Sequence, residues 1–67
     1  MITYEVNCYR DEFGEHSHRE EYSTKKAAIS AAKKHANDYP YVEVTELEKS
    51  PYTGDLVEGY VIETFRR

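Results

Sequence analysis

The residues of this chain best suited to chemistry are its histidines and its single cysteine. His16 and His18 stand two positions apart in a polar, alternating segment, so both imidazoles would lie on one side of a β-strand. Such a pair can bind zinc, and His35, Glu20 and Cys8 are the nearby candidates for further ligands. No second paired motif accompanies them, and an ordinary polar edge strand explains the two histidines as well. We therefore predict no metal ion and no cofactor.

A catalytic role for these residues is not indicated either. His35 lies at the rim of an apolar helical stripe, where a general base would still need a partner group and a concave site. Cys8 falls among the inward residues of a strand, where a thiol is usually inert packing. The acids form no obvious catalytic pair, and the chain has no glycine loop for phosphate. We predict a protein that is not an enzyme.

The elements that position these side chains begin with residues 23–39, STKKAAISAAKKHANDY, which have the only clear helical period. Ser23 or Thr24 suits the N-cap, and Pro40 ends the segment because the residue before proline disfavours helix. At 100° per residue, one side of this helix forms a core-facing stripe of Ala28, Ala32, His35, Ala36 and Tyr39, with Ile29 and Ala31 at its margins. The other side is basic and carries Lys26, Lys33 and Lys34.

The segments around the helix alternate like strands, at residues 1–9, 16–22, 41–48 and 56–65, with a bulge expected at Gly59. The polar segment 16–22 is typical of an edge strand, since charges discourage pairing with other chains. The prediction is a single α+β domain over residues 1–67, of ββαββ order, with one helix on one face of a mainly antiparallel four-stranded sheet. The other face would be open and carry Glu5, Tyr9, Tyr41, Glu43, Leu47, Val61, Glu63 and Phe65.

Length and composition set limits on this domain. The chain has 67 residues and one cysteine, which excludes an intramolecular disulfide, and stability at the low end for globular domains is expected. It shows neither a signal peptide nor an apolar run long enough to cross a membrane. We expect a cytoplasmic protein with no membrane partner.

The charge is distributed unevenly along the chain. The net charge is −4, but residues 24–37 contain Lys25, Lys26, Lys33 and Lys34 and no acid, so all 13 acidic residues lie outside this range. The molecule should therefore have a basic helix surface and an acidic remainder. The chain also contains seven tyrosines and two phenylalanines, more than a small core needs.

This layout favours protein binding over nucleic-acid binding. Aromatic residues carry interface energy, and acidic residues around them attract a basic partner, such as a protein that itself binds nucleic acid. The predicted contact surface comprises Tyr9, Phe13, Tyr41, Tyr52 and Phe65 as aromatic anchors, with Glu43 and Glu63 as charged rim. The same surface is also compatible with a homodimer. Direct binding of nucleic acid is the alternative, and it would use Lys25, Lys26, Lys33 and Lys34.

The order of a short strand, a polar turn, a polar strand and the run STKKAAISAAKK, within residues 1–40, resembles small accessory proteins of bacteriophages and mobile elements. Many of those proteins are compact, acidic and tyrosine-rich. The resemblance implies a protein that binds and inhibits a host factor, such as a nuclease of a defence system or a transcription component.

Overall fold

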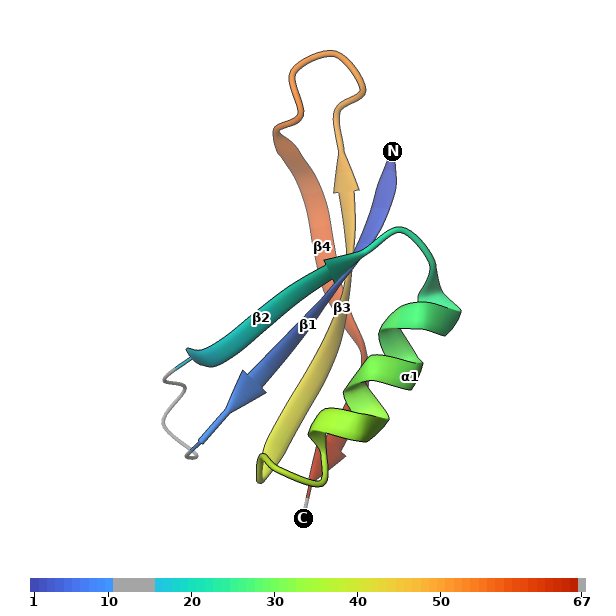
Figure 1. Cartoon of the computed structure of the whole chain (residues 1–67). Helices are drawn as coiled ribbons and strands as arrows, with labels where there is room; N and C mark the ends of the chain where they lie inside the picture. The colour runs from blue at the N-terminus through green and yellow to red at the C-terminus, as the bar shows by residue number, and fades with distance from the viewer. Residues whose placement is uncertain (11–15, 67) are drawn as a thin grey trace.

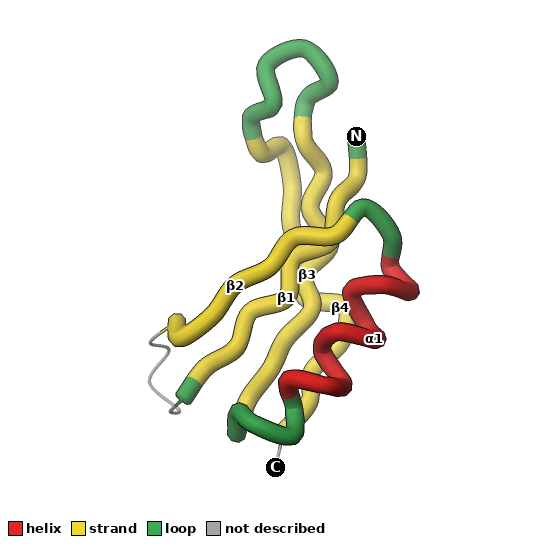
Figure 2. The backbone as a smooth tube through the Cα atoms, in the orientation of Figure 1, coloured by secondary structure: helices red, strands yellow, loops and turns green. Residues whose placement is uncertain are grey.

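A computed structural model describes residues 1–10 and 16–66 of the chain, and it contains one sheet and one helix (Figures 1 and 2). The elements follow the order β1 (Ile2–Tyr9), β2 (His16–Tyr22), α1 (Lys25–His35), β3 (Tyr41–Lys49) and β4 (Leu56–Arg66). The strands lie in the order β2-β1-β3-β4, and every neighbouring pair is antiparallel. The predicted ββαββ fold is confirmed, and so is the edge position of β2.

The helix begins and ends where local chemistry favours it. Thr24 is the N-cap: its backbone is extended, and its hydroxyl accepts a hydrogen bond from the amide of Ala27 at 3.3 Å. The helix ends at His35, four residues before the end of the predicted segment. A turn follows, in which the amides of Asp38 and Tyr39 both donate to the carbonyl of His35 at 2.9 Å.

The core lies between α1 and the face of the sheet that it covers. Residues that stand directly opposite each other on neighbouring strands share a face, so the register assigns every side chain. Val6 pairs with Val44, and Cys8 pairs with Val42. These four side chains and two helix alanines are fully buried: Val6, Cys8, Val42, Val44, Ala28 and Ala32. Ala28 and Ala32 of the predicted core-facing stripe are buried against the sheet, and their small side chains allow a close approach of the helix.

Two irregularities in the pairing of β3 with β4 change the alternation of the last strand. The register shifts between Val44 and Thr45 and again between Glu48 and Lys49. Because each shift adds one residue to β4, the side chains beyond it exchange faces. Phe65 therefore pairs with Val42 on the helix side and packs against the core, and Glu63 pairs with Val44.

The predicted placement of Phe65 and Glu63 on the open face was therefore wrong. The predicted bulge at Gly59 was also wrong, since Gly59 pairs regularly with Leu47. A Cβ atom at Gly59 would lie 2.8 Å from Cδ2 of Leu47, so a larger residue there would require the Leu47 side chain to move.

The helix is too short to cover the sheet. α1 and β4 both contain 11 residues. A helix rises only about 1.5 Å per residue, against about 3.3 Å for a strand, so α1 spans roughly half the length of β4. Figure 1 shows α1 over one half of the sheet, while the β3–β4 hairpin and the start of β1 extend beyond it. The domain thus has a covered half and a bare half along its 38 Å long axis. Within the described residues, no helix is long and apolar enough to cross a membrane.

Candidate functional site

Three of the residues predicted to form the contact surface meet on the open face. The hydroxyls of Tyr9 and Tyr41 donate to the two carboxylate oxygens of Glu43, at 2.8 and 3.0 Å. The two rings lie 5.5 Å apart, and the guanidinium of Arg66 lies 5.0 Å from the centre of the Tyr41 ring. Burial and then the hydrogen bond to Glu43 raise the pKa of Tyr9 to about 12. The polar groups of this cluster are occupied by one another.

The other predicted contact residues do not join this cluster. Phe13 lies outside the described residues. Tyr52 is 95% exposed, but it belongs to the loop after β3, at the opposite end of that strand from Tyr41 (Figure 1). Phe65 and Glu63 lie on the helix side of the sheet. The predicted residues do not form one surface, and whether any of them contacts a partner stays a prediction.

Carboxylates of the open face are largely neutralised by basic neighbours. Glu21 accepts a hydrogen bond from the ammonium of Lys49 at 2.8 Å, and this bond lowers the pKa of Glu21. Glu5 lies 3.9 Å from the guanidinium of Arg19. The charged side chains of the open face are therefore largely paired with one another.

The bare half of the helix side has the opposite character. Its residues form two rows across the strands: Ile2, Glu48 and Glu58 in one row, and Tyr4, Glu46 and Tyr60 in the next. We call five of them the acidic hairpin face: Ile2, Glu46, Glu48, Glu58 and Tyr60. Ile2 and Tyr60 are about half exposed, at 47% and 51%. Among the described residues, no basic side chain forms an ion pair with the three glutamates of this face.

The pKa of Tyr60 reflects this concentration of negative charge. A hydrogen bond to Glu46 raises the pKa of Tyr60, and the charges of Glu46, Glu58 and Glu48 raise it further. Glu48 and Glu58 are direct cross-strand partners and both are exposed. Like charges in that position destabilise a sheet. The acidic hairpin face thus holds negative charge without internal compensation.

Exposed apolar side chains lie on β4 and at the start of β1, where Leu56 and Val61 share the open face with their partners Lys49 and Thr45. Leu56 is 60% exposed and Val57 is 65% exposed, while Val61 and Met1 are exposed at 49% and 67%. Such a concentration of large apolar residues at one end of a small domain is typical of a protein interface. β4 is also an edge strand of the sheet.

The sequence reasoning missed this surface, although a signal for it was present. Along β3 the residues of one face run Val42, Val44, Glu46, Glu48. An apolar face that becomes acidic on the same strand marks where the core ends.

The predicted basic surface of the helix is present. Lys25, Lys26, Lys33 and Lys34 are exposed, and none forms an ion pair with a described residue. Lys25, Lys26 and Lys33 line a shallow hollow of about 550 Å³ beside Ile29 and Ser30. Four lysines on one face of a short helix are also an ordinary solvated surface.

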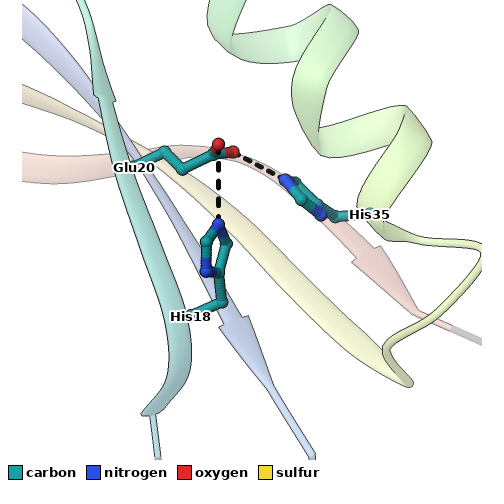
Figure 3. Close-up of side chains that lie close together, drawn as sticks. All are labelled: His18, Glu20 and His35. Atoms are coloured by element: carbon teal, nitrogen blue, oxygen red, sulfur yellow. Dashed lines mark hydrogen bonds and ion pairs between the residues drawn. The ribbon is translucent and has the colours of Figure 1, made fainter.

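Two histidines and a glutamate gather between α1 and β2 (Figure 3). Nε2 of His35 lies 2.6 Å from one carboxylate oxygen of Glu20, and Nε2 of His18 lies 3.5 Å from the other. The imidazole rings are 5.0 Å apart. The hydrogen bond from His35 lowers the pKa of Glu20. Figure 3 shows both rings directed at the carboxylate, one from the helix end and one from the edge strand.

The structure selects among the ligand candidates that the sequence offered. His16 stands opposite Tyr9 in the register, whereas His18 stands opposite Cys8, because the pairing shifts between Cys8 and Tyr9. The backbone therefore does not continue a regular two-residue alternation from His16 to His18. Cys8 is buried, and burial, with the nearby charge of Glu20, raises the pKa of its thiol to about 11. A thiol that stays protonated is a poor nucleophile and a poor ligand.

Comparisons of the chain with protein-family models, with curated proteins and with solved structures find no match.

Proposed function

We propose that this chain is a small non-enzymatic protein-binding module whose acidic hairpin face docks on a basic surface of another protein. The observation that carries the proposal is the exposed cross-strand pair of Glu48 and Glu58, beside Glu46, none of which forms an ion pair with a basic side chain of the described residues. Repulsion between these two carboxylates lowers the stability of the free domain. A partner that supplies lysine or arginine side chains would remove that cost on binding.

The surroundings of these carboxylates are suited to a protein partner. Tyr60 lies among the glutamates with half of its surface exposed, and Ile2, opposite Glu48, adds apolar area with 47% of its surface exposed. Aromatic and apolar groups supply most of the binding energy of an interface, and acidic groups around them steer and orient a basic partner. The face therefore combines the two contributions that a specific interface needs.

Other occupants of this face fit less well. Phosphate backbones would be repelled by three carboxylates. A second copy docking through the same face would bring six glutamates together. A basic protein surface is the occupant that the charge favours, and such surfaces are common on proteins that bind nucleic acid. We therefore propose inhibition or modulation of such a host protein, through occupation of its basic surface, as the biological role.

A capture experiment with matched charge-reversal variants tests this proposal. The double variant Glu48→Lys/Glu58→Lys reverses two exposed charges on the acidic hairpin face. The control Asp38→Lys/Glu63→Lys reverses two exposed charges elsewhere and has the same net charge. Each protein is immobilised, and the proteins retained from a host lysate are quantified by mass spectrometry.

We expect a basic protein that is retained by the natural chain and by the control but reduced at least tenfold by the double variant. Tyr60→Ala should weaken capture of the same protein. Equal capture by the double variant and the natural chain would exclude the acidic hairpin face as the binding surface.

The alternative is a nucleic-acid-binding accessory protein that uses Lys25, Lys26, Lys33 and Lys34. The observation that favours it is the absence of ion pairs between these lysines and described residues. A mobility-shift titration with short DNA and RNA at two salt concentrations tests it. Salt-sensitive binding that is abolished by Lys26→Glu/Lys33→Glu/Lys34→Glu, and unaffected by the double variant above, would support this alternative.

A further inference from the structure

We propose that His18, Glu20 and His35 form a binding site for a divalent metal ion of the zinc class, with water completing the coordination. The cluster is separate from the acidic hairpin face, since it lies between the C-terminal end of α1 and β2. It offers three ligand atoms from two consecutive elements, with His35 15 residues after Glu20.

The distances within the cluster are close to those of a metal site. All three ligand atoms lie within 4.8 Å of one another. Ligands about 2.0–2.1 Å from a tetrahedral zinc ion stand roughly 3.3 Å apart. The separation of 3.5 Å between His18 and Glu20 already matches, and the contact of 2.6 Å between His35 and Glu20 must lengthen slightly. The two imidazole nitrogens lie within 4.8 Å of each other and must reach a similar spacing, and the three side chains are only partly buried.

The chemistry of the three donors selects the metal. Two imidazoles and one carboxylate form a ligand set that zinc takes in open sites, where water occupies the fourth position. Calcium and magnesium prefer oxygen ligands and would leave both imidazoles unused. Copper and nickel would also bind imidazole, so they are competitors in the test rather than separate sites.

Solvent can reach the site and supply the fourth ligand. Glu20 and His35 also line a hollow of about 420 Å³, whose wall includes Ser30 and Lys34. The three ligand side chains are only partly buried, with exposed fractions of 41% for His18, 32% for Glu20 and 25% for His35. The tyrosine at the end of β2, Tyr22, hydrogen-bonds to Glu20 and would hold the carboxylate from outside the coordination shell.

A bound ion would tie the helix to the edge of the sheet. β2 is an edge strand, and its covalent connection to α1 is at the opposite end of the helix from His35. The ion would therefore close a second link between the two elements. Its binding free energy would add to the stability of the folded state, because the unfolded chain does not hold these ligands together.

Titration of the untagged, chelator-treated protein with zinc chloride tests the proposal, by calorimetry and by thermal unfolding. We expect one ion per chain and, at about 100 times the dissociation constant, a melting temperature roughly 10 °C higher or more. His18→Gln and His35→Gln should each weaken binding at least tenfold. His16→Gln is the matched control, because it removes the remaining histidine of the chain, which is not among the proposed ligands, and it should leave the affinity unchanged within twofold.

A second measurement keeps the test valid if a variant fails to fold. In nuclear magnetic resonance spectra of the natural chain, zinc should shift the imidazole signals of His18 and His35 and leave those of His16 in place. The proposal is overturned if zinc causes neither heat of binding nor a change in these signals, or if His16→Gln is the damaging substitution. Neither result would affect the proposed protein-binding function, whose test uses different residues.

Discussion

The same substitution, valine to alanine, should have very different costs in the covered and the bare halves of the sheet. Val44 is fully buried under α1, whereas Val57 is 65% exposed on β4. Each removed methylene-sized group is worth about 0.8 kcal/mol when it is fully buried. Val44→Ala therefore loses about 1.6 kcal/mol of transfer free energy, and the cavity left behind raises the total to about 2–3 kcal/mol. Val57→Ala loses only the buried third of that transfer term, about 0.5 kcal/mol.

Thermal and urea unfolding followed by circular dichroism measure this difference. For a domain of this size, 1 kcal/mol corresponds to about 4–8 °C in melting temperature, so Val44→Ala should lower it by about 10–20 °C. Val57→Ala should lower it by about 2–4 °C. Both positions are in strands, so the loss of β propensity is similar in the two variants. Equal losses, or a larger loss for Val57→Ala, would refute the division of the sheet into a covered and a bare half.

Three further predictions follow from the packing and from the open-face cluster. Ala32→Leu should reduce the free energy of unfolding by about 1–3 kcal/mol through overpacking, and an unchanged urea midpoint would show that Ala32 does not pack against the sheet. Phe65→Ala should destabilise the domain by about 2 kcal/mol, since its ring packs against the core. An unchanged melting temperature would indicate that Phe65 lies on the open face. The pKa of Tyr9 is raised from 10.0 in the unfolded chain to about 12 in the fold, so its stabilising contribution is complete below pH 10 and is lost as the pH rises towards 12. Tyr9→Phe should remove this part of the alkaline loss of stability, and tyrosinate absorbance during the titration checks it.

The sequence was sufficient for the elements because their signals are local. The helical period of residues 23–39 and the strict alternation of β1 depend on neighbours within a few positions. The polarity of residues 16–22 indicated an edge strand for the same reason, and β2 is at the edge.

The faces of β4 could not be predicted, because bulges depend on the partner strand. Alternation carried through residues 56–65 assigns Phe65 to the same side as Val61, but the shift between Val44 and Thr45 places Phe65 opposite Val42. One inserted residue was enough to move an aromatic ring from the predicted contact surface into the packing against the core.

The histidine cluster shows a different limit. Glu20 and His35 were candidate ligands from the sequence, but the pairing of His16 with His18 followed only from their spacing. Their meeting with the helix end depends on how α1 crosses the sheet, which no local pattern encodes. The sequence suggested a pair within one strand, His16 with His18. The structure instead brings together His18 of β2 and His35 of α1.

The central claim is that a basic protein docks on the acidic hairpin face. Hydrogen–deuterium exchange of the chain, alone and in complex with the captured protein, tests it most directly. We expect slower exchange in peptides covering residues 46–48 and 56–61 and unchanged exchange in the helix, residues 25–35. Protection confined to the helix, with the hairpin unchanged, would contradict the claim and place the working surface on the lysines.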